Sequence, residues 1–92
     1  MDLIRVAEIE PRGGFKLRIF FNDGLSGVLD FSNLLTGAVF SSLKELTKFS
    51  TARVRYGTIV WDGDLDMAPE YLYTKMVEQG GGLKRTSPLS HL

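Results

Sequence analysis

The chain has 92 residues, a length that supports one domain with a single small hydrophobic core. Apolar residues make up 43% of it and charged residues 24%, which are the proportions of a folded globular protein and exclude a disordered chain. Eleven basic residues balance eleven acidic ones, so the chain carries no overall field that would attract nucleic acid or an anionic membrane.

The sequence contains no cysteine, which excludes disulfide bonds, thiolate nucleophiles and cysteine-ligated zinc. Its first residues, MDLIRVAEIEP, do not combine a basic start with an apolar stretch, as an export signal does. No apolar run approaches the roughly 20 residues of a membrane span. We therefore expect a cytoplasmic protein that has no contact with a membrane.

The first third of the chain shows the alternation of a β-sheet. Residues 3–11 are rich in Ile, Val and Ala and end at a Pro-Arg-Gly-Gly turn, which predicts a strand and a reversal. In residues 15–22, four large apolar side chains alternate with mostly polar ones. The turn sequence Asn-Asp-Gly at 22–24 predicts a hairpin, with residues 25–31 as the return strand. Together these segments predict an antiparallel meander.

The middle of the chain predicts a short helix and a second hairpin. Apolar residues recur at helical spacing over residues 39–49, which favours one amphipathic helix on the sheet. Residues 52–56 and 58–61 carry β-branched and aromatic side chains on either side of Gly57, which predicts two paired strands. The acidic segment 62–66 has the composition of a loop.

The last third predicts one helix and a tail. Pro69 followed by Glu70 is typical of a helix start, because proline tolerates the first helical position and an acidic side chain there favours the helix dipole. This helix should end near Glu78, before three consecutive glycines. Residues 80–92 show no periodicity and are expected to form a flexible C-terminal tail.

These segments predict an α+β fold. We expect an antiparallel sheet of about five strands, made of a three-stranded meander plus a hairpin, with two short helices on one face. Residues 1–79 would form the single domain. On the meander, Phe20 interrupts the polar face, so we expect a second layer, another subunit or solvent to cover it.

The charges are distributed unevenly along the chain. Residues 57–79 carry five acidic side chains against one lysine, a net charge of −4. Four of the five acidic residues cluster within nine positions and form the predicted partner-binding surface: Asp62, Asp64, Asp66 and Glu70. Such a patch suits a basic partner. The alternative interpretation is that these residues stabilise the turn and the start of the helix.

The three aspartates of this patch also have the one-three-five spacing of an EF-hand calcium loop. The rest of that motif is absent, because the sixth position is Met67 instead of glycine and the twelfth is Tyr73 instead of glutamate. We therefore predict no metal site. The sequence predicts no cofactor either.

A second set of charges supports an alternative function. Lys16, Arg18, Arg53 and Arg55 alternate along two predicted strands and, on one sheet face, would offer a surface for nucleic acid. Alternating basic residues are also the ordinary solvated side of an antiparallel sheet. A nucleic-acid-associated regulatory domain is therefore kept as an alternative.

Catalytic residues are not evident in the sequence. His91 is the single imidazole and lies in the predicted tail, so the serines have no histidine base in the folded part. The nearest carboxylate pairs, Glu8 with Glu10 and Asp62 with Asp64, have no apolar surroundings to separate their pKa values. We predict that the protein is not an enzyme, with a small ligand-binding domain or carboxylate enzyme as the remaining alternative.

Two segments, FFNDGLSGVLDFSNLLTGAVFSSL and GTIVWDGDLDMAPEYLY, carry an ordered series of motifs. The residues that form this series are Phe21, Asp23, Gly24, Asp30, Phe31, Gly37, Val39, Phe40, Leu43, Trp61, Asp66, Pro69, Glu70, Leu72 and Tyr73. Over residues 3 to about 77, the series resembles the bacterial domain of unknown function family 2442 (DUF2442). Gly63 stands one residue earlier than the family pattern places it.

This resemblance implies a small α+β domain with no established activity and no assigned catalytic residues. It also implies an accessory or antitoxin-like role, because stand-alone members are suspected partners of a small neighbouring protein. We therefore expect a protein-interaction domain whose partner is another small, basic protein, with homodimerisation as a further option.

Overall fold

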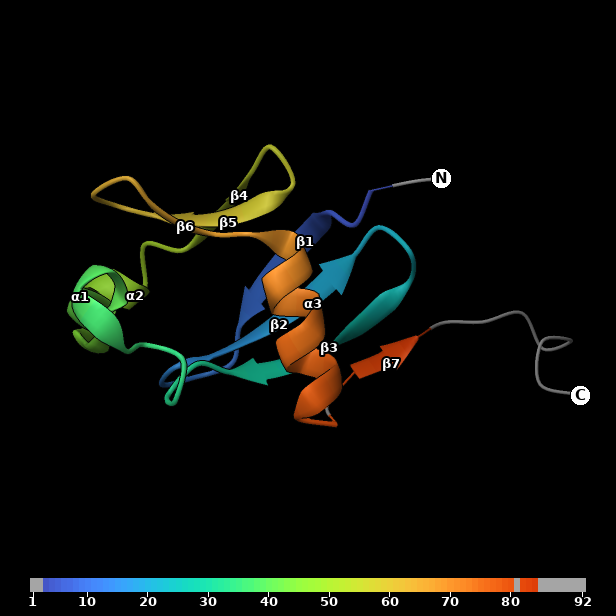
Figure 1. The fold of residues 1–92 in the computed structure, drawn as a ribbon, viewed down its shortest axis with the longest axis horizontal. Helices are drawn as coiled ribbons and strands as arrows, with labels where there is room; N and C mark the ends of the chain where they lie inside the picture. The colour runs from blue at the N-terminus through green and yellow to red at the C-terminus, as the bar shows by residue number, and fades with distance from the viewer. Residues whose placement is uncertain (1–2, 81, 85–92) are drawn as a thin grey trace, which may run out of the picture.

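The computed structural model describes residues 3–80 and 82–84. These residues form an α+β fold, viewed in Figure 1. The strands are β1 (Val6–Pro11), β2 (Lys16–Phe21), β3 (Leu25–Asp30), β4 (Arg53–Arg55), β5 (Thr58–Trp61), β6 (Leu65–Met67) and β7 (Gly82–Lys84). The helical segments are α1 (Gly37–Phe40), the 3-10 helix η1 (Ser41–Lys44), α2 (Leu46–Phe49) and α3 (Pro69–Glu78).

A four-stranded antiparallel sheet, here the first sheet, has the order β1-β2-β3-β7. The predicted meander forms its first three strands. Leu17, Ile19 and Phe21 of β2 are all buried, as their alternation predicts. At the β2–β3 turn, the Asp23 carboxylate accepts the Leu25 N–H (3.0 Å), which explains why the Asn-Asp-Gly sequence reverses the chain.

A three-stranded antiparallel sheet, here the second sheet, has the order β4-β5-β6. The α+β class is therefore confirmed, whereas the prediction of one sheet of about five strands is wrong. The reason is that Ile59, Trp61 and Met67 share an apolar face that must be buried, so the second sheet lies over the core instead of widening the first. The Val6 N–H donates to the Gly57 carbonyl (2.7 Å) and links the two sheets.

The second sheet contains a strand where a loop was expected. Leu65–Met67 were predicted to lie in or beside the acidic loop, but they pair with β5 as β6. Trp61 lies opposite Leu65, and Ile59 lies opposite Met67. The turn between the two strands is therefore limited to residues 62–64.

The single helix expected over residues 39–49 is instead divided into α1, η1 and α2. The division between η1 and α2 falls at Glu45, whose backbone is extended (φ −83°, ψ 118°). On a continuous α-helix, Leu43 and Phe49 would point about 120° apart. The interruption allows both side chains to be fully buried, while Leu46 remains 49% exposed.

The predicted helix at Pro69–Glu78 is confirmed as α3. Proline occupies its first turn with Glu70 beside it, as the sequence pattern predicts. Leu72 and Met76 lie four residues apart and are both fully buried. In Figure 1, α3 crosses β2 and β3, so this helix covers the first sheet from one side.

Part of the predicted tail joins the fold. Gly80 has a left-handed backbone (φ 69°) that reverses the chain after α3, and Gly82–Lys84 then pair with Leu25–Gly27 of β3. Here the structure shows a strand where a flexible tail was predicted, because β3 has a free edge whose backbone groups need partners. The rest of that prediction, residues 81 and 85–92, lies outside the described residues.

One hydrophobic core lies between the two sheets and α3. Its buried members are Val6, Leu17, Ile19, Phe21, Leu25, Leu29, Phe31, Leu35, Leu43, Phe49, Ile59, Trp61, Met67, Leu72 and Met76. Phe31 makes edge-to-face contacts with Phe49 (ring centroids 5.3 Å apart) and Trp61 (6.0 Å). These aromatic contacts join the helical segment to the second sheet.

Candidate functional site

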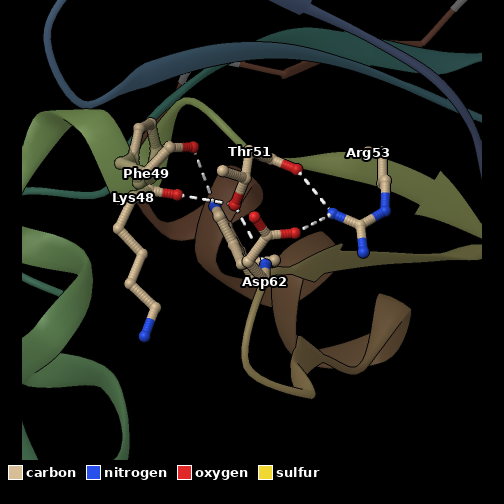
Figure 2. Close-up of polar contacts among 6 residues, drawn as sticks. Lys48, Phe49, Thr51, Arg53 and Asp62 are labelled. Atoms are coloured by element: carbon tan, nitrogen blue, oxygen red, sulfur yellow. Dashed lines mark hydrogen bonds and ion pairs between the residues drawn. The ribbon is translucent and has the colours of Figure 1, made fainter.

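Hydrogen bonds fix the β5–β6 turn to the end of α2 (Figure 2). The Trp61 indole N–H donates to the Phe49 carbonyl (3.0 Å), and the Asp62 N–H donates to the Thr51 hydroxyl oxygen (3.0 Å). That hydroxyl in turn donates to the Lys48 carbonyl (2.7 Å). The turn that carries the predicted acidic residues therefore has a fixed position on the fold.

Asp62 also forms an ion pair with Arg53 (Figure 2). The Arg53 Nη1 atom lies 3.0 Å from the Asp62 carboxylate and 3.0 Å from the Thr51 carbonyl. The two charged side chains are 46% and 65% exposed, so the pair adds little to stability. Asp62 was predicted to bind a basic partner and Arg53 was an alternative contact for nucleic acid, yet the two residues neutralise each other.

The other predicted binding residues of the second sheet are Arg55, Asp64 and Asp66. They surround one depression, which we call the hairpin hollow. It lies on the outward face of the sheet, where Arg53 is opposite Val60 and Val60 is opposite Asp66. Its volume is about 340 Å³. Its lining residues are Arg53, Arg55, Tyr56, Val60, Trp61, Asp64, Leu65 and Asp66.

Two turns with unusual backbone conformations form the rim of the hairpin hollow. Tyr56 and Gly57 connect β4 to β5, and both have a positive φ (53° and 78°), which is the pattern of a tight type I′ hairpin. Tyrosine is rare in this conformation, and this one is 86% exposed. Asp64, in the β5–β6 turn, also has a positive φ (61°).

The charges at the hairpin hollow have opposite signs and are mostly uncompensated. The Arg55 guanidinium lies 5.8 Å from the Tyr56 ring centroid, a cation–π contact. Within residues 3–80, the side chains of Asp64 and Asp66 have no hydrogen bond or ion pair, and Arg55 has no carboxylate partner. These three groups are therefore available to a ligand or partner.

Glu70, the fourth predicted acidic residue, does not line the hairpin hollow. It is exposed in the first turn of α3, where a carboxylate is favoured by the helix dipole. The structure therefore brings Asp64 and Asp66 together at one site, uses Asp62 within the fold and leaves Glu70 outside the depression.

The four basic residues of the nucleic-acid alternative do not share one face. Arg53 and Arg55 lie on the second sheet, whereas Lys16 and Arg18 lie on β2 of the first sheet. Lys16 is opposite Asp30 in the strand register, and Arg18 is opposite Glu10. Acidic residues therefore accompany the basic ones on both sheets.

Asp30 is held by the turn that follows β3. Its carboxylate accepts the Ser32 N–H (2.9 Å) and the Ser32 hydroxyl proton (2.7 Å). The Ser32 backbone bond and then its hydroxyl bond lower the pKa of Asp30, with a smaller contribution from the charge of Lys16. This carboxylate is a structural group of the turn.

Tyr56, Val60 and Leu65 were not predicted as site residues. The Tyr56-Gly57 pair was a signal for the hairpin, but a sequence does not show that a tyrosine at such a turn will be left exposed. Leu65 lines the hairpin hollow because β6 pairs with β5, and β6 was missed. Val60 lies on a strand that was predicted, but the sequence does not show that its side chain borders a depression.

A second depression of about 340 Å³ lies between α2 and the β1–β2 turn. Its lining is mainly apolar and includes Ile9, Leu17, Leu46 and Phe49. Lys16 is its one charged lining residue. Without converging polar groups, this depression has nothing to orient a small ligand.

Neither a metal site nor a membrane span is found in the described part of the chain. Over residues 3–80 and 82–84, no three His, Asp or Glu side chains converge as metal ligands would. None of the helices in these ranges has the length and apolar character needed to cross a bilayer. His91 lies outside the described residues.

The family model for DUF2442, described as a protein of unknown function, matches residues 6–78. The chain belongs to this family. The suspected resemblance is thereby confirmed, over nearly the same residues. No curated protein and no solved structure matches the chain.

Many residues of the DUF2442 pattern have structural roles in this protein. Phe31, Leu43, Trp61 and Leu72 belong to the buried core. The Tyr73 hydroxyl donates to the Asp23 carboxylate (2.6 Å), so two distant motif positions bond to each other. The motifs thus account for the fold, whereas Arg55 and Tyr56 at the hairpin hollow are not part of them.

Proposed function

We propose that this DUF2442 protein is a protein-interaction domain of a bacterial, cytoplasmic, accessory or antitoxin-like type, and not an enzyme. Its partner would bind at the hairpin hollow. The observation that carries this proposal is that Arg55, Asp64 and Asp66 surround one depression and, within residues 3–80, have no charge partner.

The hairpin hollow has the composition of a protein-binding centre. Tyr and Arg are enriched among the residues that contribute most to binding, and here Arg55 and Tyr56 project from one tight turn. Val60, on the outward face of β5, provides apolar surface between the charged groups. An exposed tyrosine presents a large contact area at a low cost in conformational entropy.

The charges of the hairpin hollow also specify the partner's chemistry. Because Arg53 is neutralised by Asp62, the charges of the hairpin hollow that no described residue compensates are two carboxylates and one guanidinium. A basic segment would therefore place Lys or Arg against Asp64 and Asp66, and its own carboxylate or backbone carbonyl against Arg55. Charge complementarity of this kind raises the association rate and depends on salt.

A charge reversal tests this proposal. The tagged protein and the double variant Asp64→Lys/Asp66→Lys are used to capture partners from an extract of the source cells, identified by mass spectrometry. Asp64 and Asp66 are exposed, but lysine tolerates the positive φ of Asp64 less well than aspartate does, by about 1 kcal/mol. The melting temperature should therefore fall by no more than about 8 °C, while capture of a stoichiometric basic protein is abolished.

The matched control is Glu45→Lys/Glu78→Lys, which makes the same change in charge at exposed positions away from the hairpin hollow. This control should retain the partner. If the folded Asp64→Lys/Asp66→Lys protein captures the same partner in the same amount, the hairpin hollow is not the binding site and the proposal fails.

The two alternatives have less support. A nucleic-acid-associated domain would need Lys16, Arg18, Arg53 and Arg55 to act together, and they lie on two different sheets. A ligand-binding domain or enzyme would use a carboxylate site, for which Asp64 and Asp66 are the nearest pair on one depression. Nucleic acid in the captured material, measured by absorbance and lost steeply with salt, would favour the first alternative over our proposal.

A further inference from the structure

The outward face of the first sheet is a second surface with a definite pattern. It lies opposite the face that carries the buried side chains. Its members from β1 to β3, identified by the strand register, are Glu8, Glu10, Lys16, Arg18, Phe20, Ser26, Val28 and Asp30. The outward charges of β1 are all acidic, whereas those of β2 are all basic.

This outward face has an apolar centre that is not part of the core. Phe20 and Val28 are half-buried, yet neither belongs to the core cluster nor packs against it. Leu72 and Met76 of α3 pack with the core residues on the opposite face. Within the described residues, the outward face is therefore one side of the first sheet that α3 does not cover.

Within residues 3–80, no carboxylate pairs with Arg18 at this centre. Its guanidinium carbon lies 5.2 Å from the Phe20 ring centroid, and its Nε atom is buried without a hydrogen bond to the described residues. Glu10 is directly opposite Arg18 in the register, but no ion pair joins them. The buried Nε atom cannot be reached from outside, but the Arg18 side chain is only half-buried, so its charge is open to a carboxylate of another chain.

We propose that a second copy of this chain covers β1 and β2 on the outward face of the first sheet in a twofold dimer. The twofold axis runs parallel to the strands, between β1 and β2. A rotation about this axis places β1 of each copy over β2 of the other. Each residue keeps its position along the strand direction. Because Glu10 and Arg18 are at the same level, Glu10 of each copy then lies over Arg18 of the partner subunit.

Repulsion between like charges excludes the nearest alternative position of the twofold axis. An axis directly over β2 would place Arg18 against Arg18 of the partner subunit, and like charges in an interface are strongly unfavourable. With the axis between β1 and β2, Phe20 lies under β1 of the partner subunit, at the level of Glu8 of the partner subunit, whereas Val28 on β3 stays outside the overlap. Lys16 stays beside Asp30 of its own chain.

The dimer should be weak because the face is small. With the axis between β1 and β2, only these two strands of each copy overlap. Strands of six residues are about 20 Å long at roughly 3.3 Å per residue, and two strands span about 10 Å. The overlap is about 200 Å² per copy, well below the roughly 800 Å² of a standard interface. We expect association with a dissociation constant of about 0.1 to 1 mM.

Complementary charge variants test the pairing across the interface. Sedimentation velocity at rising concentration should show a monomer–dimer equilibrium for the natural chain. Glu10→Arg alone and Arg18→Glu alone should each weaken dimerisation by about tenfold or more, because each places like charges across the interface. Mixing the two single variants should restore dimers, since each chain then meets the charge it lacks.

The mixture separates an effect between chains from an effect within one chain. Each single variant keeps like charges opposite each other on its own β1 and β2, and mixing cannot repair that. Lys44→Glu, an exposed charge reversal on η1, is the control and should dimerise as the natural chain does. If either single variant fails to fold, Arg18→Gln replaces it and should also weaken the dimer, because it removes the charge without adding an opposing one.

Three results would overturn the inference. The first is a natural chain that remains monomeric at about 1 mM, the weak limit of specific association. The second is dimerisation that Arg18→Glu and Arg18→Gln leave unchanged. The third is a mixture of the two folded single variants that does not associate. The dimer does not depend on the hairpin hollow, since Asp64→Lys/Asp66→Lys should leave it intact.

Discussion

At the scale of single residues, Thr51 connects three segments of the chain. Its hydroxyl accepts the Asp62 N–H and donates to the Lys48 carbonyl, and its own carbonyl accepts from Arg53. The side chain is half-buried, so water cannot freely replace these bonds. Thr51 thereby holds the β5–β6 turn, with Asp64 at its end, in place.

Replacing Thr51 with valine keeps the shape of the side chain and removes its hydroxyl. We expect Thr51→Val to lower the free energy of unfolding by about 1–3 kcal/mol, because the Asp62 N–H loses its acceptor. Chemical denaturation measures this loss. Thr47→Val is the control, since the Thr47 hydroxyl bonds only to exposed Glu45, and its effect should stay within about 0.5 kcal/mol. Equal effects of the two substitutions would contradict the role of Thr51.

Tyr73 provides a prediction about pH. Its hydrogen bond to Asp23, together with burial and the charge of that carboxylate, raises the pKa of Tyr73 above its ordinary value of 10.0. A raised pKa stabilises the fold below the unfolded-state value, and this contribution is lost as the pH rises through the folded-state value. Tyr73→Phe should therefore be less stable than the natural chain by about 1–2 kcal/mol near neutral pH.

The difference in the free energy of unfolding between Tyr73→Phe and the natural chain should shrink as the pH rises above 10. Urea denaturation at a series of pH values measures it. A difference that stays constant up to pH values well above 10 would show that the Tyr73 hydroxyl does not carry this contribution.

At the scale of elements, the end of α3 closes the edge of β3. The Gln79 amide pairs with the backbone of Asp30 as a neighbouring strand would, accepting its N–H (3.1 Å) and donating to its carbonyl (2.9 Å). β7 then pairs with Leu25–Gly27 further along the same edge. The exposed edge of a sheet is an aggregation hazard, and these contacts protect it.

Removing the Gln79 amide should open this edge locally. In Gln79→Ala, we expect hydrogen exchange of the Asp30 amide to accelerate by about tenfold, which corresponds to the loss of one hydrogen bond. NMR measures this exchange residue by residue. Glu78→Ala, which removes only a contact to Lys75, should leave the Asp30 amide protected. Unchanged protection in Gln79→Ala would mean that another group closes the edge.

The helices and strands that were predicted correctly are those specified by residues close together in the sequence. The alternation in β2, the Asn-Asp-Gly turn before β3 and the proline at the start of α3 each depend on neighbouring residues, so they can be read directly from the sequence. β6 and β7 are three residues long, too short to show a period. They form because β5 and β3 offer free edges to them, which is a property of the folded chain.

The candidate site could be predicted only in part for the same reason. Asp64 and Asp66 were identified from their charge. Asp62 pairs with Arg53 because β5 turns back along β4, and Asp66 joins Arg55 at one depression because β6 turns back along β5. A charge count shows neither arrangement. Lys16 and Arg18 lie apart from Arg53 and Arg55 because the strands are divided between two sheets. This division is also a property of the folded chain and not of the local sequence.

At the scale of the whole molecule, the two sheets share one core. Residues of β2, β3, β5, β6 and α3 belong to the same buried cluster. We therefore expect a single cooperative unfolding transition, with equal calorimetric and van't Hoff enthalpies. A resolved second transition, or different midpoints by tryptophan fluorescence and by far-ultraviolet circular dichroism, would show that the sheets are independent units.

The molecule presents the outward faces of its two sheets to different partners under our proposals. The second sheet offers the hairpin hollow to a basic protein, and the first sheet offers its charge-patterned face to a second copy. The α3 helix and the core between the sheets leave both of these faces accessible. Two binding functions can therefore coexist on one small domain.

The central claim is that a partner binds at the hairpin hollow, and hydrogen exchange of the partner-bound protein tests it most directly. With the captured partner at saturation, we predict that exchange slows in residues 53–56 and 60–66, while amides of the first sheet, including those of β1, are unchanged by that partner. Protection confined to the first sheet, or no protection around Tyr56 and Asp64 in a saturated complex, would contradict the claim.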